Sequence, residues 1–270
     1  MNVLDLFSGI GGFSLGLERA GMRTVAFCEI DEWCRDLIRS HWPGVSILED
    51  VRTDAFPPAD IICGGFPCQD ISLAGRRAGV TGDRSGLYRE VLRAIRLVRP
   101  KFTILENVAA LLGLGMGRVL GDVAEDGLDA EWDCISAGDL GAPHGRDRVW
   151  ITLADPDKLK RQERCAKGAG WWLWSQEEIA AVSDTNGVWQ LEPPRLLGDI
   201  RRRVDDAARS GAWWSDNWQA KFEALRGMDD GVRSRLDRSA VAQAVKRLGN
   251  AVVPQIPEII GRAIMNSQPR

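Results

Sequence analysis

A strand, a glycine turn and a helix follow one another at the start of the chain, and this order restricts the fold more than any other feature. Val3 to Phe7 (VLDLF) is a short apolar run typical of a buried strand. The turn SGIGG follows, and then Phe13, Leu17 and Ala20 recur at helical spacing. Glycines let a ligand approach the backbone closely, and a helix N-terminus offers free N–H groups. We therefore expect a nucleotide-binding α/β unit.

Acidic residues end the next two predicted strands. Glu29 lies near the end of the run Thr24 to Ile30. An acid about 20 residues after a glycine turn is placed to bind ribose hydroxyls, whereas the alternative is an exposed charge at a strand end. Another strand, around Val45 to Leu48, leads to Asp50, which can accept a hydrogen bond from an adenine amino group. Asp31 can cap the helix between these strands.

The candidate nucleophile lies in the segment DIICGGFPCQDIS. Asp60 to Cys63 reads as a buried strand, and Gly64–Gly65 should let the chain leave it. Pro67 then fixes one backbone dihedral just before the thiol of Cys68. A cysteine on a rigid loop after a buried strand is where an α/β enzyme places a nucleophile. A buried structural cysteine is the alternative, and we favour the nucleophile because other segments supply its partners.

Those partners are one carboxylate and two arginines. The strand Phe102 to Leu105 ends at Glu106, and a carboxylate at the end of a central strand should point into the same crevice as Cys68. Arg146 and Arg148 lead into another strand, and side chains two residues apart on a strand share a face. Both guanidiniums are therefore expected in the crevice.

Periodicity assigns the remaining elements of the expected domain. Leu87 to Val98 and residues 111–129 read as helical, and Trp132 to Ala137 reads as a strand. The stretch from Pro254 onward is an apolar-periodic helix. The Gly- and Arg-rich stretch that precedes Leu87 is interpreted as a loop able to close over a substrate.

These segments, taken in order, resemble the motifs of the DNA cytosine-5 methyltransferases. The stretches that carry the resemblance are DLFSGIGG, FCEID, LEDV, GGFPCQDIS, LENV, the segment GRDR and RLGNAVVPQIPEIIGRAI. They cover roughly residues 2–154 and 248–265 and look like those of a small bacterial or phage enzyme. The resemblance implies a Rossmann-like, S-adenosylmethionine-dependent methyltransferase sheet with a small, irregular target-recognition domain.

The resemblance also implies roles for individual residues. It assigns catalysis to Cys68, Glu106, Arg146 and Arg148. Its implied contacts to the cofactor S-adenosylmethionine are Phe7, Gly9, Ile10, Gly11, Glu29, Ile30, Asp50, Val51, Pro67, Leu87, Asn250 and Val252. The implied reaction places a methyl group on carbon 5 of a flipped-out cytosine through a covalent Cys68 adduct, and it needs no metal.

Three segments are expected along the chain: a catalytic and cofactor-binding domain at 1–154, a target-recognition region at 155–231, and a segment at 232–270 that returns to the first. The middle segment loses strand–helix alternation, and we interpret its tryptophans as the core of a small domain. Two positions depart from the family pattern. His144 stands where glutamine is usual, which leaves its role open, and Ala251 stands where serine is usual.

Composition sets outer limits on the function. The chain has 270 residues and a formal net charge of −3, which argues against nonspecific coating of nucleic acid but allows a cationic cleft for double-stranded DNA. No apolar run reaches the roughly 18 residues of a membrane span, and the N-terminus lacks the pattern of a secretion signal. Six dispersed cysteines without CxxC pairs are typical of reduced thiols in a cytoplasm. We expect a cytoplasmic monomer that does not bind membranes.

Three other functions share some of these features. An RNA-acting branch of the same family carries the same motifs and acts on transfer RNA, but nothing in 155–231 is typical of it. A catalytically silent DNA-binding protein on this fold would be expected to lack Cys68 or Glu106, and both are present. A dinucleotide oxidoreductase would need a third glycine where Ser14 stands.

Overall fold

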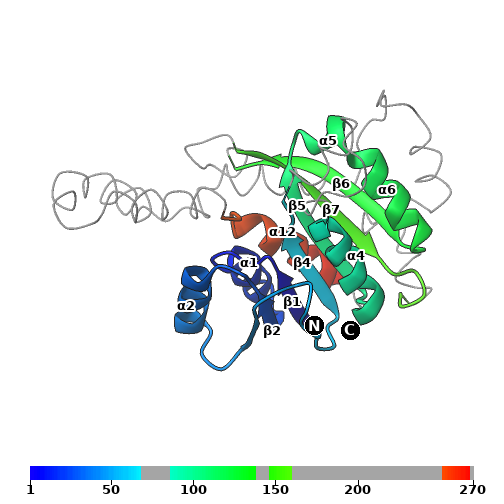
Figure 1. Cartoon of the computed structure of the whole chain (residues 1–270). Helices are drawn as coiled ribbons and strands as arrows, with labels where there is room; N and C mark the ends of the chain where they lie inside the picture. The colour runs from blue at the N-terminus through cyan, green and yellow to red at the C-terminus, as the bar shows by residue number, and fades with distance from the viewer. Residues whose placement is uncertain (68–85, 138–145, 160–250, 268–270) are drawn as a thin grey trace.

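A computed structural model describes residues 1–67, 86–137, 146–159 and 251–267 of the chain (Figure 1). In these ranges one sheet has the strand order β3-β2-β1-β4-β5-β7-β6. The strands are β1 (Asn2–Leu6), β2 (Arg23–Cys28), β3 (Ser46–Leu48), β4 (Ile61–Gly65), β5 (Phe102–Val108), β6 (Asp129–Ser136) and β7 (Asp147–Ala154). The helices are α1 (Gly12–Arg19), α2 (Glu32–His41), α4 (Gly86–Val98), α5 (Leu111–Leu114), α6 (Met116–Glu125) and α12 (Gln255–Ser267).

The sheet is parallel from β3 to β5, and β7 runs antiparallel to both β5 and β6. The chain builds outward from β1 in two directions, first to β2 and β3 and then to β4 and β5. This confirms the expected Rossmann-like α/β fold. Ligands of such sheets bind at the carboxyl ends of the strands beside the point where the strand order reverses, which here lies between β1 and β4.

Side chains alternate between two cores, one on each face of the sheet. Along β1, Val3 packs in the core with Leu17 of α1 and Ile260 of α12, whereas Leu4 packs on the other face with Val91 of α4. All of these side chains are buried. The alternation follows from the pleat of a strand, which directs successive side chains to opposite faces.

The helix α4 shows how the local sequence produces this packing. Tyr88, Val91, Leu92 and Ile95 recur at helical spacing, and each is buried. Burying one such side chain contributes roughly 1.5–3 kcal/mol to stability. The helix ends at Val98, two residues before Pro100. A proline disfavours the helical conformation of the residue before it, which accounts for this end.

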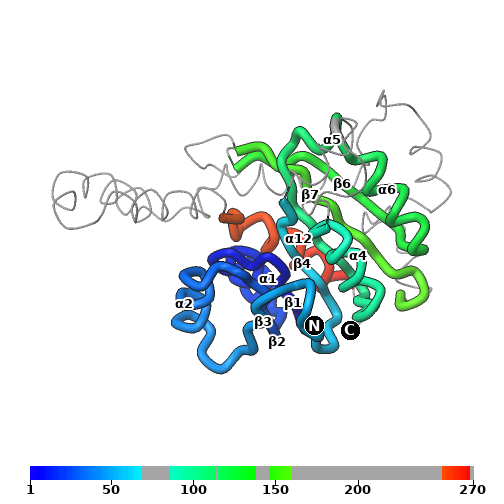
Figure 2. The backbone as a smooth tube through the Cα atoms, viewed as in Figure 1, coloured from blue at the N-terminus to red at the C-terminus, as the bar shows by residue number. Residues whose placement is uncertain are grey.

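Helices α1 and α12 can pack closely because glycines lie where the two segments meet. A β-carbon built on Gly16 would lie 2.2 Å from the carbonyl oxygen of Pro254, and one on Gly12 would lie 2.5 Å from that of Val252. On α12, a β-carbon at Gly261 would lie 2.9 Å from that of Ala20. Figure 2 shows the C-terminal segment in red beside the N-terminal helix in blue. Helix α12 thus lies beside α1, and the return of the whole segment 232–270 stays a prediction.

The predicted exit from β4 at Gly64–Gly65 is wrong. The strand continues through both glycines, with Gly64 opposite Leu6 and Gly65 opposite Glu106. A β-carbon on Gly64 would lie 2.5 Å from the carbonyl oxygen of Leu6. The pair therefore allows close approach between neighbouring strands rather than a turn, and the chain leaves the strand at Phe66.

Other boundaries also differ from the expectation. The predicted helix over residues 111–129 is two helices, because Gly115 between them has an extended φ of −166°. The second of these ends before Gly127, whose φ is +73°, and β6 begins at Asp129 rather than Trp132. The predicted cap of α2 is confirmed, since the Asp31 side chain accepts a hydrogen bond from the Cys34 backbone.

In the described ranges, no helix combines the length and apolar character that a membrane span requires. Residues 160–250, which hold most of the predicted target-recognition region, lie outside those ranges. The domain boundaries at residues 154 and 231 therefore stay predictions.

Candidate active site

The glycine turn after β1 has a left-handed backbone at three positions. The φ angles of Phe7, Gly9 and Gly11 are 54°, 55° and 82°. A β-carbon on Gly11 would lie 2.6 Å from the ring of Trp42, so both its conformation and its surroundings require glycine. At Gly9 no atom lies within 4 Å of such a β-carbon. The turn is therefore packed at Gly11 and open at Gly9, where a ligand can approach the backbone.

Glu29 fastens this turn to the end of β2. Its Oε2 accepts a hydrogen bond of 2.7 Å from the Gly9 backbone, and its Oε1 accepts one of 2.8 Å from the Asp31 backbone. A solvated charge at a strand end would make neither bond, so this alternative does not hold. The neighbouring Ile30 is 67% exposed, which is unusual for a large aliphatic side chain and leaves it free to contact a ligand.

A third predicted cofactor segment follows β3. Arg52 donates to both carboxylate oxygens of Asp50, at 2.7 Å from its Nη2 and 2.9 Å from its Nε. Hydrogen bonding to this arginine lowers the pKa of Asp50. Val51 is buried in the core shared with α4, and its carbonyl oxygen accepts a hydrogen bond from Arg93. Neither arginine was predicted from the sequence.

The predicted catalytic carboxylate lies inside β5. Glu106 pairs with Gly65 of β4 on one side and with Trp150 of β7 on the other. The Nε of Arg148 lies 2.9 Å from its Oε1, and the Glu106 side chain is only 11% exposed. Burial raises the pKa of Glu106, while Arg148 and then Arg146 counteract part of that rise. The structure thus brings Glu106 and Arg148 together as a partly buried ion pair.

Arg146 reaches the same region by another route. It precedes β7 and has a φ of 34°, so the expectation that it shares a strand face with Arg148 is wrong. Its Nη2 donates a hydrogen bond of 2.9 Å to the carbonyl oxygen of Ala251. Burial lowers the pKa of Arg146. Arg146 therefore ties the C-terminal segment to the strand that carries Arg148.

Asn107 holds the segment that leads to the candidate nucleophile. Its Nδ2 donates a hydrogen bond of 2.9 Å to the carbonyl oxygen of Phe66, and the side chain is buried. Phe66 and Pro67 directly precede Cys68 in the sequence. The sequence reading assigned no role to Asn107, although its place right after Glu106 was a signal.

The remaining predicted residues divide between the described ranges and the rest of the chain. Leu87 lies in the first turn of α4 and packs against the hydrophobic core on that face of the sheet. Val252 lies against Gly12 at the start of α1. Cys68, Asn250 and His144 lie outside the described ranges. Pro67 is the last residue described before Cys68 and is exposed.

Strand register places the two groups of predicted residues side by side. Leu6 pairs with Gly64, and Gly64 pairs with Leu105, so the carboxyl ends of β1, β4 and β5 coincide. The glycine turn and Glu106 each follow directly from these positions. The turn with Glu29 and the pair of Glu106 with Arg148 therefore share one edge of the sheet.

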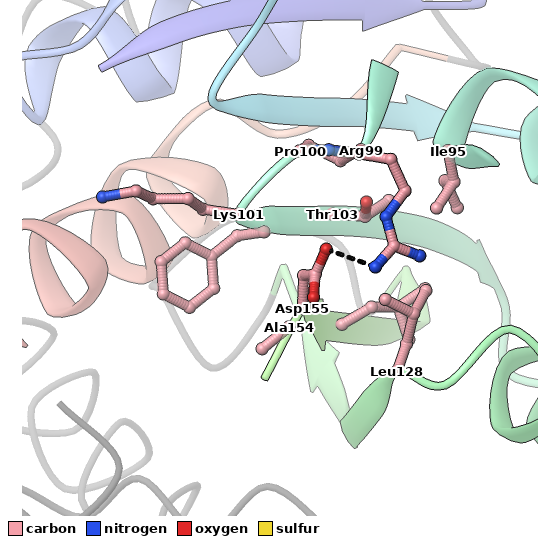
Figure 3. A pocket seen from close by; sticks show the side chains of 10 residues that line it. Ile95, Arg99, Pro100, Lys101, Thr103, Leu128, Ala154 and Asp155 are labelled. Atoms are coloured by element: carbon pink, nitrogen blue, oxygen red, sulfur yellow. Dashed lines mark ion pairs between the residues drawn. The ribbon is translucent and has the colours of Figure 1, made fainter. Parts of the chain in front are cut away.

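A small hollow lies at the opposite edge of the sheet (Figure 3). There Arg99 forms an ion pair of 2.9 Å with Asp155, at the amino end of β5 and the carboxyl end of β7. The other residues that line the hollow are Ile95, Pro100, Lys101, Phe102, Thr103, Leu128, Leu153 and Ala154. None of these is a predicted site residue, so the hollow is separate from the candidate active site.

Comparison with known proteins identifies the family. Residues 1–187 match the family model described as C-5 cytosine-specific DNA methylase. The chain belongs to this family. Among curated relatives of this C-5 cytosine-specific DNA methylase, Type II methyltransferase M.Eco47II of Escherichia coli is 41% identical over 232 residues, covering 79% of this chain and 54% of that protein.

A second curated relative and a solved structure are also similar to the chain. Type II methyltransferase M2.BsuMI of Bacillus subtilis is 28% identical over 311 residues, covering all of this methylase chain and 76% of that protein. The solved structure of S. pombe Dnmt2 methyltransferase superposes with a TM-score of 0.51 at 20% identity, covering 59% of this chain and 52% of that one. This likeness supports the fold. The methylase chain spans about half the length, or less, of most of the curated relatives it matches.

Proposed function

We propose that this protein methylates carbon 5 of cytosine in a specific sequence of double-stranded DNA, with S-adenosylmethionine as methyl donor. The observation that carries the proposal is the partly buried pair of Glu106 with Arg148, together with the bond of Asn107 to the Phe66 carbonyl. Gly65, which pairs with Glu106, and Phe66, which Asn107 bonds, precede Cys68 by three and two residues in the sequence. The type II methyltransferase relatives support a role of restriction-modification type.

The residues at the carboxyl ends of β1, β2 and β3 fit an adenosyl ligand. Gly9 leaves open space beside its backbone, and Ile30 presents an exposed apolar face. The two oxygens of Glu29 each accept one backbone bond and keep a further lone pair for a ribose hydroxyl. S-adenosylmethionine bound there would supply an electrophilic methyl group. Asp50 and Val51 would frame its adenine.

Cys68 is proposed as the nucleophile, because carbon 5 of cytosine reacts poorly on its own. Its thiolate attacks carbon 6, and the new sulfur–carbon bond makes carbon 5 nucleophilic. Carbon 5 would then take the methyl group from the sulfonium, and the cofactor would leave as S-adenosylhomocysteine. Loss of the proton from carbon 5 to a base then restores the double bond and expels the Cys68 thiolate.

Glu106 and Arg148 would offset the charge that develops on the ring during this attack. Because burial raises the pKa of Glu106, its carboxyl is suited to share a proton with ring nitrogen 3. Arg148 is suited to the ring carbonyl oxygen. Arg146, bonded to Ala251, would support the C-terminal segment at the same edge.

The target cytosine would have to leave the DNA stack, since its face is inaccessible within a duplex. Rotating a base out costs a few kcal/mol. We propose that residues 155–231 recognise the target sequence and that 232–270 complete the cofactor site. Action as a cytoplasmic monomer stays a prediction.

Analysis of the methylated product tests this function. Purified protein would be incubated with plasmid DNA and S-adenosylmethionine, and the digested nucleosides separated by mass spectrometry. We expect 5-methyldeoxycytidine with the wild type and none with Cys68→Ala. Parallel incubation with transfer RNA distinguishes the RNA-acting branch. Methylated transfer RNA with unmethylated DNA would overturn the proposal, as would methylation at an exocyclic nitrogen.

A further inference from the structure

Arg93 joins helix α4 to the turn that follows β3. Its Nη2 donates to the carbonyl oxygen of Val51, and its Nε donates to the carboxylate of Glu90 one turn earlier on the same helix. Its guanidinium carbon lies 5.0 Å from the centre of the Phe56 ring. The guanidinium therefore bonds the turn, stacks on the segment beyond it and is oriented by its own helix.

Several other hydrogen bonds around this turn are local. Asp54 accepts backbone bonds from Glu49 at 2.7 Å and from Asp50 at 3.1 Å, and Arg52 bonds to Asp50. These local contacts give the turn its shape, and an ion pair of 3.8 Å between Glu49 and Arg35 links its start to α2. Arg93 supplies a polar bond from a different element, about 40 residues along the chain, and Val51 adds its buried side chain.

The helix that carries Arg93 also carries Leu87, another predicted cofactor contact. One wall of the proposed adenosyl site thus belongs to the turn of Asp50 and Val51, and a second belongs to the first turn of α4. The Arg93 contacts fix these two walls relative to each other. Among the predicted cofactor residues, Val51 contributes to this through apolar packing, whereas Arg93 supplies the polar bond.

We propose that Arg93 is a positioning residue that sets the affinity for the adenosyl part of S-adenosylmethionine by holding the turn of Asp50 and Val51 against α4. The inference rests on the proposed function, because it assigns the turn to the adenine. A preorganised site binds more tightly, since ordering it on binding costs free energy. Arg93 acts through Val51 and touches no reacting atom, so its loss should change cofactor affinity and leave the chemical step intact.

The test compares Arg93→Met with Arg96→Met. Arg96 lies on the same helix and also forms an ion pair, with Asp126 at 2.7 Å, but it contacts α6 rather than the turn. The two variants remove the same charge and keep the aliphatic stem. Titration calorimetry with S-adenosylhomocysteine gives the Kd without DNA, and steady-state methylation gives KM and kcat.

We expect Arg93→Met to raise both the Kd and the KM for the cofactor about tenfold, the loss anticipated when a preorganised site is loosened. Its kcat at saturating cofactor should stay within about twofold of the wild type, and Arg96→Met should change neither constant. Arg93→Lys keeps the charge but lacks the planar fork, so it should restore only part of the affinity.

Each other outcome overturns the inference. An Arg93→Met protein that binds S-adenosylhomocysteine as the wild type does would remove Arg93 from this role, as would a fall in kcat with unchanged Kd. If Arg93→Met does not fold, Phe56→Leu, which removes only the stacking surface, should raise the Kd by a smaller factor, and an unchanged Kd would overturn the inference. A wild type that fails to bind S-adenosylhomocysteine would instead refute the proposed function.

Discussion

The carboxylate of Glu106 occupies space that a side chain on Gly65 would take. A β-carbon built on Gly65 would lie 3.0 Å from Glu106 Oε2, and the two residues pair directly across β4 and β5. The same carboxylate contacts Arg148 through its other oxygen. The glycine therefore permits the orientation of the proposed proton-sharing group.

Gly65→Ala should lower turnover with little loss of stability. The added methyl group would displace the Glu106 carboxylate by a few tenths of an ångström, and a misplaced catalytic group costs about tenfold or more in kcat. The control is Gly113→Ala, where no atom lies within 4 Å of the new β-carbon. Single-turnover methylation rates give the comparison. Equal rates for the two variants would show that Glu106 tolerates the displacement and is not oriented by Gly65.

Glu29→Ala should weaken binding of S-adenosylmethionine about tenfold or more. The substitution removes two charge-assisted bonds that fasten the glycine turn, and it also removes the proposed contact to the ribose. Together these are worth about 1.5–3 kcal/mol or more. Glu32→Ala, an exposed residue at the start of α2, is the control for a nearby loss of charge. Calorimetric titration measures both. A folded Glu29→Ala protein with wild-type affinity would exclude Glu29 from the site.

Arg99→Met should destabilise the fold by about 1–2 kcal/mol, because it leaves the buried carboxylate of Asp155 without its cation. The Arg99 side chain is 41% exposed, which keeps the loss at the lower end for such pairs. Arg39→Met breaks a pair in which both side chains are more than half exposed and should cost no more than about 0.5 kcal/mol. Urea denaturation tests the difference. Similar losses for both variants would contradict the account of the Arg99 pair.

Glu131 should make stability depend on pH. It is 3% exposed on β6, and neither carboxylate oxygen has a hydrogen-bond partner within the ranges that the structure describes. Burial, with a smaller effect of Asp133, raises its pKa to about 9. Because this folded-state pKa exceeds the unfolded one, the carboxyl must take up a proton on folding at neutral pH. The contribution of Glu131 to the free energy of unfolding is therefore fully present below its unfolded pKa. That contribution is lost as the pH rises toward about 9.

Glu131→Gln cannot ionise, so it should gain stability over the wild type as the pH rises. The gain should be small near pH 5 and reach about 3 kcal/mol, to order of magnitude, near pH 7. Urea midpoints at both pH values measure it. Glu125→Gln, an exposed carboxyl at the end of α6, should differ little from the wild type at either pH. A Glu131→Gln protein with no pH-dependent gain would show that Glu131 is ionised in the fold.

Short-range patterns were enough to predict the order of strands and helices, and they pointed to several candidate site residues. The apolar runs of β1, β2 and β5 and the helical spacing of α4 depend on local sequence, and the structure confirms these elements. Glu29 and Glu106 were predicted as site residues because each follows an apolar run typical of a strand, although Glu106 itself lies inside β5.

Contacts between distant segments could not be read in the same way. Gly64–Gly65 has the composition of a turn, but its proximity to Leu6 and Glu106 depends on strand pairing. The bonds of Asn107 to Phe66 and of Arg93 to Val51 join segments about 40 residues apart, and no local pattern marks them. Arg146 was misplaced because alternation was extended one residue beyond the start of β7.

Cys68 is proposed to bond to carbon 6 of the target cytosine. If so, a methylated adduct forms that is released only when carbon 5 loses its proton. Fluorine at carbon 5 cannot leave as a cation, so it should trap the adduct.

The decisive measurement is therefore incubation with DNA that carries 5-fluorocytosine at the target, in the presence of S-adenosylmethionine. We expect a protein–DNA complex that survives denaturation and maps by peptide mass to the segment containing Cys68, and no complex with Cys68→Ala. A wild-type protein that methylates carbon 5 of ordinary cytosine yet forms no such complex would contradict the assignment of Cys68 as nucleophile.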